Sequence, residues 1–224
     1  MQGSSTTRWS VLAGLLVLLG ATGCRTGAEE VVLFYPPRAL EASGVEAPPL
    51  GAEAPSLLLA GPVDRRVRPG TVGVTRGPGS IVTGWVRASN DGAEWVRDAA
   101  RFELTQRGLT VLEAQEMDAG TDPAVSPERP RLGLELELLE AEAAADEDHP
   151  ARVVLAATLR LDERIHLARR IRGDAQAVGA TGVRLDPAES LAVALREALR
   201  PIAREAVALA LREATGDPSL ERDP

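Results

Sequence analysis

The stretch RLGLELELLE, Arg131–Glu140, decides the fold class of this chain. Leucine stands at every second position from Leu132 to Leu138, with glycine or glutamate between. Successive side chains of an extended chain point to opposite faces, so one face of this segment is apolar and the other is polar. The alternation is typical of a strand in an antiparallel sheet that has one face in the core and one in water.

Two more strands are predicted after this one, at ARVVLAATLRL (Ala151–Leu161) and RIHLARRIRG (Arg164–Gly173). In the second of them we expect Ile165, Leu167 and Ile171 to share the buried face, while the polar residues between them face water. The connections between the three strands are short, which predicts an antiparallel meander.

A helix is predicted upstream of the meander, over EWVRDAARFELTQR, residues 94–107. Asp91 and Glu94 have the spacing of a capping box, in which the first carboxylate accepts from free backbone amides and the second reaches back. Apolar residues recur along one stripe of this segment, and the charged residues fall largely on its other faces. Gly108 supplies the left-handed residue that commonly ends a helix.

A second, longer helix is predicted after residue 186. Asp186 and Glu189 form another capping box, with Pro187 at the first helical position. Apolar residues then continue at helical spacing to about Ala214. Pro201 lies inside this run and is expected to kink or split the helix, because proline removes one backbone hydrogen bond.

The segment before the first helix is less regular. SLLLAGPV predicts a short strand over Leu57–Val63, and the glycine-dense stretch over residues 68–91 reads as a loop with one short strand around Ile81–Val86. LTVLEA, Leu109–Ala114, predicts a strand after the first helix. We therefore expect a single α+β domain over residues 57–216, a two-layer sandwich in which two helices pack on one face of a mostly antiparallel sheet.

The amino-terminal residues have the parts of a secretory signal. Residues 1–23 hold a polar start with one arginine, the apolar run Val11–Leu19, and small residues directly before Cys24, the only cysteine. A bilayer core needs about 20 apolar residues, so this run predicts a cleaved signal rather than a permanent span. We expect residues 24–56, rich in proline and alanine, to form a tether, and residues 217–224 a disordered tail.

The residues before Cys24 resemble the lipobox of bacterial lipoproteins, with Ala21 where leucine is commonest. The resemblance implies that the Cys24 thiol carries a diacylglyceryl group and that its amine is acylated after cleavage, a set of chains sufficient for stable anchoring. Arg25 follows, and in this class a residue other than aspartate there implies the outer rather than the inner membrane. The alternative is a generic signal peptide followed by an incidental cysteine.

Composition excludes one class of partner. The chain has a formal net charge of −8 and no lysine, and aromatic residues make up 3% of it. Nonspecific nucleic-acid binding draws its affinity from clustered positive charge, and single-stranded nucleic acid also needs aromatic surfaces on which bases stack. We therefore expect no nucleic-acid partner.

One polar group stands out as a candidate binding site for an anion or an acidic partner. It consists of arginines that flank the glycine-rich stretch and one neighbouring acid: Asp64, Arg65, Arg66, Arg68 and Arg76. Arginine binds carboxylates and phosphates through two parallel hydrogen bonds, which makes this residue type suited to such ligands. The alternative is ordinary surface salt bridging in a chain with many acids.

No catalytic or metal-binding pattern is found. His149 and His166 have no ligand spacing between them, although acids lie close to His149. The glycine-rich stretch has Val82 where the dinucleotide fingerprint needs glycine, and a phosphate loop would need a lysine. Serines lack the context of a nucleophile. We therefore expect no metal, no cofactor and no enzymatic activity.

Several segments resemble the YajG-like family of bacterial lipoproteins over most of residues 57–214. These segments are the lipobox at Cys24, PVDRR (Pro62–Arg66), VGVTRGPGSIVTGWV (Val72–Val86), EWVRDAARFELTQRGLTV (Glu94–Val111) and the alanine-rich helix after DPAES. The resemblance implies a periplasm-facing lipoprotein without established chemistry. The proline-rich segment before residue 57 and the long loops at 115–130 and 141–150 depart from the family pattern.

Together these patterns predict a lipid-anchored lipoprotein on the periplasmic face of the outer membrane. We expect it to act as a non-enzymatic binding or assembly accessory, with the membrane and an envelope protein or glycan as partners. Two alternatives stay open: an envelope hydrolase that uses carboxylates, and a component that handles lipid or lipopolysaccharide when the sheet and helices part around Pro201.

Overall fold

Two helices and nine strands build the part of the chain that this computed structural model describes, residues 28–35, 54–76, 79, 81–113, 131–144, 149–176 and 185–215. The elements in chain order are β1 (Glu29–Val31), β2 (Ser56–Leu59), β3 (Val63–Asp64), β4 (Thr71–Arg76), β5 (Val82–Ala88), α2 (Gly92–Thr105), β6 (Thr110–Glu113), β7 (Leu132–Glu142), β8 (Ala151–Leu161), β9 (Arg164–Ala175) and α4 (Pro187–Thr215). Cys24, the predicted signal peptide and the predicted tail lie outside the described residues.

The larger sheet has the strand order β6-β2-β7-β8-β9, and β3 pairs with the same strand β7. The predicted meander is confirmed, since β7, β8 and β9 are antiparallel neighbours over nearly their whole length. The strands before the meander differ from the expectation, because β2 and β3 run parallel to β7 and β6 runs parallel to β2. The fold is α+β as predicted, with a sheet that is mixed rather than uniformly antiparallel.

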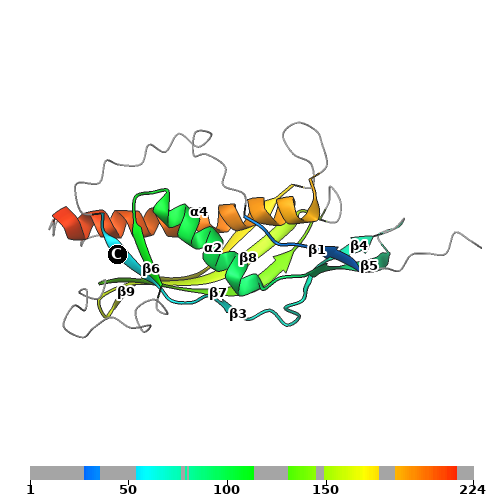
Figure 1. Ribbon diagram of the computed structural model, residues 1–224, viewed down its shortest axis with the longest axis horizontal. Coiled ribbons are helices and arrows are strands. Elements are labelled where there is room, and N and C mark those ends of the chain that lie inside the picture. The colour runs from blue at the N-terminus through cyan, green and yellow to red at the C-terminus, as the bar shows by residue number, and fades with distance from the viewer. Residues whose placement is uncertain are drawn as a thin grey trace, which may run out of the picture.

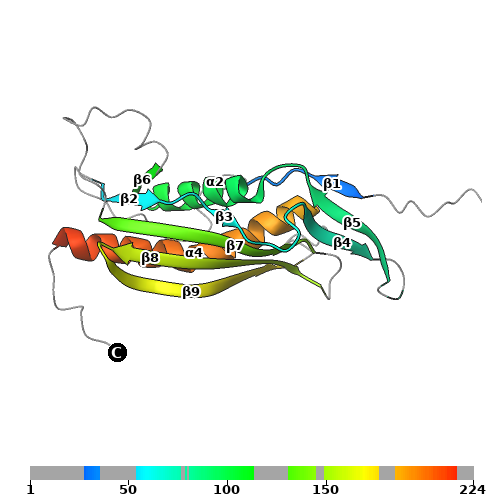
Figure 2. The same ribbon diagram turned by 90° about the horizontal axis from the view of Figure 1, so that it is seen from below.

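Both helices cover one face of this sheet, so the two-layer arrangement is confirmed (Figures 1 and 2). The four alternating leucines of β7 are all 2% exposed or less, as are three leucines in the first half of α4. These side chains form the centre of the core: Leu132, Leu134, Leu136, Leu138, Leu191, Leu195 and Leu199. Burial of an apolar face at about 25 cal/mol per Å² holds the two layers together.

One residue of the meander departs from the expected alternation. Leu167 and Ile171 are buried as predicted, but Ile165 is 55% exposed. The register explains the difference, because Leu159 pairs with Leu167 whereas the next residue, Arg160, pairs with Ile165. The extra residue in β9 forms a bulge, which reverses the faces of the side chains before it.

A smaller sheet of three strands, in the order β1-β5-β4, lies at one end of the long axis of the molecule (Figures 1 and 2). The glycine-dense stretch that was expected to be mainly loop forms most of it, as the antiparallel pair β4 and β5. Its glycines allow close approach to the main sheet: a Cβ at Gly73 would stand 3.2 Å from the Cβ of Ala143. The amide of Ala143 also donates to the carbonyl of Val72, 2.5 Å away, which joins the two sheets.

Residues 29–35 belong to the folded domain, so the predicted tether over residues 24–56 does not hold for them. β1 pairs in parallel with β5, and the side chains of Val31 and Leu33 are buried. The indole Nε1 of Trp95 donates to the carbonyl of Phe34 over 3.0 Å. Residues 29–31 form an edge strand of the small sheet, and the residues after them pack along α2.

The predicted cap at Asp91, the stop at Gly108 and the capping box of Asp186 and Glu189 are confirmed, whereas no return bond to Glu94 is seen among the described residues. Asp91 caps α2 by accepting from the amide of Ala93 at 2.7 Å, and Gly108 after the helix has a φ of 86°. Asp186 likewise accepts from the amide of Ala188 at the start of α4. α4 continues as one helix through Pro201, so the expected split does not occur.

Candidate functional site

A groove with a volume of about 490 Å³ opens where the small sheet meets the far end of β7. Its walls come from the loop after β3, from one face of β4 and β5, and from the last residues of β7. The lining residues are Arg66, Val67, Arg68, Thr71, Gly73, Val74, Trp85, Leu139, Glu140, Ala141 and Glu142. The groove therefore combines apolar walls with two arginines and two glutamates.

Arg68 and Trp85 lie against each other in an exposed part of this groove. The guanidinium carbon of Arg68 lies 5.3 Å from the centre of the Trp85 ring, the geometry of a cation–π contact. Trp85 is 43% exposed and its neighbour in the groove, Val67, is 99% exposed. Trp85, stacked against Arg68 and next to the exposed Val67 side chain, gives this groove a surface suited to contact with another molecule.

Arg66 is held in place beneath the groove by Asp64. The Arg66 Nε and Nη2 atoms donate to the two Asp64 carboxylate oxygens at 2.9 Å and 2.6 Å. The Arg66 side chain is only 5% exposed, and its Nη1 atom has no hydrogen-bond partner among the described residues. Burial alone would raise the pKa of Asp64, but the hydrogen bonds and positive charge of Arg66 outweigh it and hold that pKa below its usual value.

The structure brings together only part of the polar group that the sequence singled out. Arg66 and Arg68 line the groove, and Asp64 orients the first of them. Arg65 instead points to Glu137 on β7, 3.4 Å away, and is well exposed. Arg76 stands at the end of β4 opposite Val82 and does not line the groove. Whether the group binds an anion stays a prediction.

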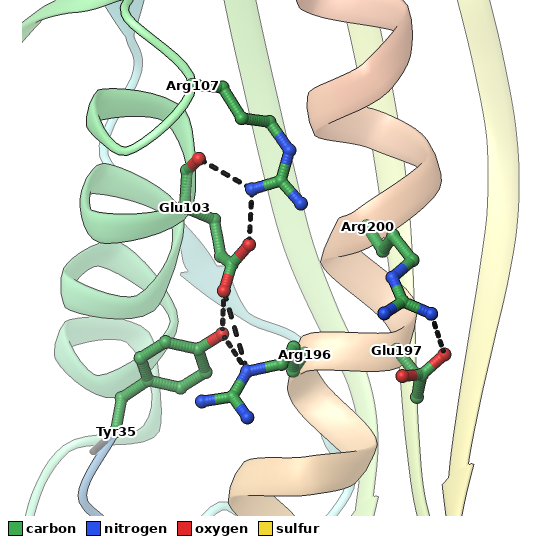
Figure 3. A network of polar contacts seen from close by, with 6 residues as sticks. All are labelled: Tyr35, Glu103, Arg107, Arg196, Glu197 and Arg200. Carbon is green, nitrogen blue, oxygen red and sulfur yellow. Dashed lines mark hydrogen bonds and ion pairs between the residues drawn. The ribbon is translucent and has the colours of Figure 1, made fainter. Parts of the chain in front are cut away.

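A second polar cluster, buried between α2 and α4, was not found from the sequence (Figure 3). Glu103 lies at its centre: its carboxylate accepts from the Tyr35 hydroxyl and from Arg107, each at 2.5 Å. The Nε atom of Arg196 on α4 donates to the same hydroxyl at 3.2 Å and lies 3.6 Å from the carboxylate. Two arginines and a phenol thus surround one buried carboxylate.

This cluster joins the amino-terminal segment to both helices. The pKa of Tyr35 lies well above its usual value. Burial is the main cause, and the hydrogen bond that Tyr35 makes to the charged Glu103 adds to it. The phenol therefore stays protonated at neutral pH and donates to Glu103. The side chains of Glu103 and Arg107 are each only 6% exposed, against the expectation that the charged residues of α2 would lie off its packed face.

The sequence does hold one signal for Trp85 of the groove and one for Glu103 and Arg107 of the buried cluster. Ile81, Thr83 and Trp85 alternate with Val82, Gly84 and Val86, the period of a strand that places a tryptophan on its open face. Glu103 and Arg107 have the i, i+4 spacing of a helical ion pair. Neither signal identifies the contacts from other elements, which are Arg68 for Trp85 and Arg196 for Glu103. These contacts decide how far each side chain is buried.

The described ranges hold no group of three histidine, cysteine, aspartate or glutamate side chains able to bind a metal ion. His149 and His166 are both exposed. Among the helices of the described part, none is long and apolar enough to cross a bilayer.

No protein-family model and no curated protein matches the sequence. The fold is similar to the crystal structure of protein XCC0632 from Xanthomonas campestris, of family DUF330, at 15% identity and a TM-score of 0.48, over 85% of this chain and 99% of that one. It is also similar to PelC from Paraburkholderia phytofirmans, crystallised as a dodecamer, at 11% identity and a TM-score of 0.38, over 68% of this chain and 93% of that one.

A third similar structure is lipoprotein GNA1162 from Neisseria meningitidis, at 11% identity and a TM-score of 0.30, over 73% of this chain and 99% of that one. A DUF330 protein and a bacterial lipoprotein are thus among the structures that resemble this chain. The TM-scores are all below 0.5, so the function of the chain is inferred from its own residues.

Proposed function

We propose that this chain is a lipid-anchored lipoprotein of the bacterial envelope, related to the YajG-like family, that faces the periplasm from the outer membrane. It acts there as a non-enzymatic binding or assembly accessory for an envelope protein or glycan. Cys24 is the anchor, and the groove around Arg66, Arg68 and Trp85 is the candidate contact surface.

The lipobox before Cys24 supports the anchor, and the structure adds that this residue lies close along the chain to the folded domain. Only four residues separate Cys24 from β1, whose first residue is Glu29. The residues that follow are held by the buried side chains of Val31 and Leu33 and by the buried cluster around Glu103. An acylated Cys24 would therefore bind the whole domain to the bilayer through a short, firmly attached segment.

The groove supports the binding role. Tryptophan and arginine are the residue types that contribute most to binding at protein interfaces, and here Trp85 and Arg68 are stacked on each other at an open surface. The arginine Arg66 is pre-oriented by Asp64. This pairing fixes Arg66 in the wall of the groove with its side chain only 5% exposed, so the exposed guanidinium of Arg68 is the one that a carboxylate or phosphate group would reach.

Replacement of the anchor tests the proposal. Cys24→Ala is expected to abolish acyl labelling, to move the protein from the membrane to the soluble periplasmic fraction, and to remove its cross-links to envelope components in intact cells. Ala21→Leu, which introduces the commonest lipobox residue, is the matched control and is expected to keep labelling and membrane association. An unlabelled wild-type chain that still carries residues 1–23 would contradict the proposal.

A further inference from the structure

The pairing of β1 fixes how far the anchor can extend from the small sheet. β1 runs parallel to β5, with Glu29 opposite Val86 and Val31 opposite Ala88, so both strands begin from the same side of the small sheet. Cys24 precedes Glu29 by five residues, which span at most about 17 Å when fully extended. Ile81 precedes Val86 by the same five residues. Cys24 can therefore come level with Ile81 but cannot extend much beyond it.

The small sheet and the groove loop carry half of the exposed large apolar side chains among the described residues. These four of eight side chains are Val67, Ile81, Val82 and Trp85. Val32 and Phe34 are also exposed but follow β1 towards α2, where the indole of Trp95 donates to the Phe34 carbonyl. Figures 1 and 2 place β1, β4 and β5 together at one end of the long axis, away from the carboxyl-terminal half of α4.

The character of this surface fits the boundary between lipid headgroups and acyl chains. Tryptophan is enriched at that depth, and arginine side chains reach from apolar surroundings towards the headgroups. The Arg68 guanidinium on the Trp85 ring combines both residue types. Charge here is mixed, because Glu29, Glu30 and the two groove glutamates accompany the arginines. Apolar side chains rather than net charge therefore favour the contact.

From the reach of the anchor and the position of these side chains, we infer that the end of the small sheet is a membrane-contact surface. Ile81, Trp85 and Val67 enter the headgroup layer of the bilayer into which the acyl chains of Cys24 insert. This inference rests on the proposed lipid anchor and assigns the Val67 and Trp85 side of the groove to the phospholipid surface, so that an envelope protein or glycan would bind elsewhere on the domain. The long axis then points away from the bilayer, with the end of α4 farthest from it.

The single cysteine of the chain allows a direct test. Acylation blocks the Cys24 thiol, so the variants Ile81→Cys and Ile165→Cys each present one free thiol for a spin label on the full mature lipoprotein. Ile81 is 67% exposed and Ile165, on β9, is 55% exposed, which makes the second a matched control. In phospholipid vesicles the collision ratio of oxygen to a water-soluble nickel complex is expected to be several-fold higher at position 81 than at position 165.

Each other outcome has a defined meaning. Equal ratios at the two positions in an acylated protein would overturn the contact surface while the anchor stands. A label at position 81 that neither reagent reaches would indicate cover by a second copy of the chain and would also overturn it. Two labels per chain would show that Cys24 is free, and the proposed function would fail.

Tryptophan fluorescence tests the same contact without an introduced cysteine, so the result does not depend on whether a cysteine variant folds. Trp85 and Trp95 are the tryptophans of the chain after residue 23, and Trp95 is only 2% exposed. Lipids brominated near the headgroup are expected to quench part of the fluorescence of the unsubstituted lipoprotein. Trp85→Phe is expected to abolish that quenching, and quenching that persists in this variant would contradict the contact.

Discussion

At the scale of single residues, the charges inside this protein are stable because each has a partner within hydrogen-bond distance. Removing a charge from water costs several kcal/mol, a cost that is offset only by close and well-directed pairing. Glu103 meets this condition through Tyr35 and Arg107, with the charge of Arg196 3.6 Å away, and Arg66 meets it through Asp64. Replacing one partner leaves the other charge buried without compensation, so such changes are expected to be costly.

Asp64→Asn tests this at the groove. The pKa of Asp64 is lower in the folded chain than in the unfolded chain, so its carboxylate adds stability above the unfolded pKa of about 3.9, and this stability is lost as the pH falls through the lower folded value. The variant is expected to lose about 3 kcal/mol of unfolding free energy at pH 7. In urea titrations the difference from wild type should shrink steadily below pH 4.

The exposed pair of Arg65 and Glu137 supplies the control for this prediction. Both side chains are more than 40% exposed, so Glu137→Gln is expected to change the unfolding free energy by less than about 1 kcal/mol at any pH. An Asp64→Asn difference that does not depend on pH would show that the carboxylate charge is not what stabilises Arg66.

At the scale of elements, the packing of α4 on β9 depends on one glycine. A Cβ at Gly173 would stand 1.9 Å from the backbone carbonyl oxygen of Ala194 and 2.5 Å from the amide nitrogen of Ala198. Backbone atoms of a helix cannot move aside as a flexible side chain can. Small residues on both elements thus allow the helix to lie almost directly on the strand.

Gly173→Ala is therefore expected to force α4 away from β9 and to lower the unfolding free energy by about 3 kcal/mol or more. Gly133→Ala, on β7, is the matched control, because a Cβ there would meet nothing within 4 Å. The control is expected to change stability by less than about 1 kcal/mol. Chemical denaturation of the two variants measures the difference, and equal effects would contradict this account of the packing.

At the scale of the whole molecule, residues 29–35 join the amino-terminal end of the described chain to the core. Leu33 lies in the core with its amide donating to the Asn90 side chain, and Tyr35 reaches the cluster between the helices. Under the proposed anchor at Cys24, only four residues would separate the attachment point from the folded part of the chain, which begins with β1 at Glu29.

Leu33→Ala is expected to lower the unfolding free energy by about 2–5 kcal/mol, because it opens a cavity in the core. Val32→Ala, at the neighbouring position that is 63% exposed, is expected to change it by less than about 0.5 kcal/mol. Thermal unfolding of the two variants compares the effects. If Leu33→Ala were as stable as Val32→Ala, the segment would not be part of the cooperative fold.

Much of the fold could be predicted because its signals are local. These signals each depend on residues only a few positions apart. They are the period of the leucines in β7, the caps at Asp91 and Asp186, and the helix stop at Gly108. The structure places them as expected. The strand β4 was missed because its glycines and its neighbouring proline resemble a loop until β5 pairs with it.

The candidate site was only partly predictable. The sequence singles out the arginine side chains as a candidate group but gives no sign that Arg65 turns to Glu137 while Arg66 turns to Asp64. Trp85 was not selected at all, since its role depends on Arg68 lying across its ring. Both facts depend on contacts between separate elements.

The sequence by itself determined the local elements and the α+β class, because hydrophobic period and helix caps act over a few residues. It also carries the predicted signal and anchor at Cys24. Only the tertiary structure decided that Val31 and Leu33 belong to the core, that β2 and β3 lie parallel to β7, and that a charged residue such as Glu103 is buried. These outcomes depend on which distant surfaces meet, and the free energy of burial and pairing exists only once they are in contact.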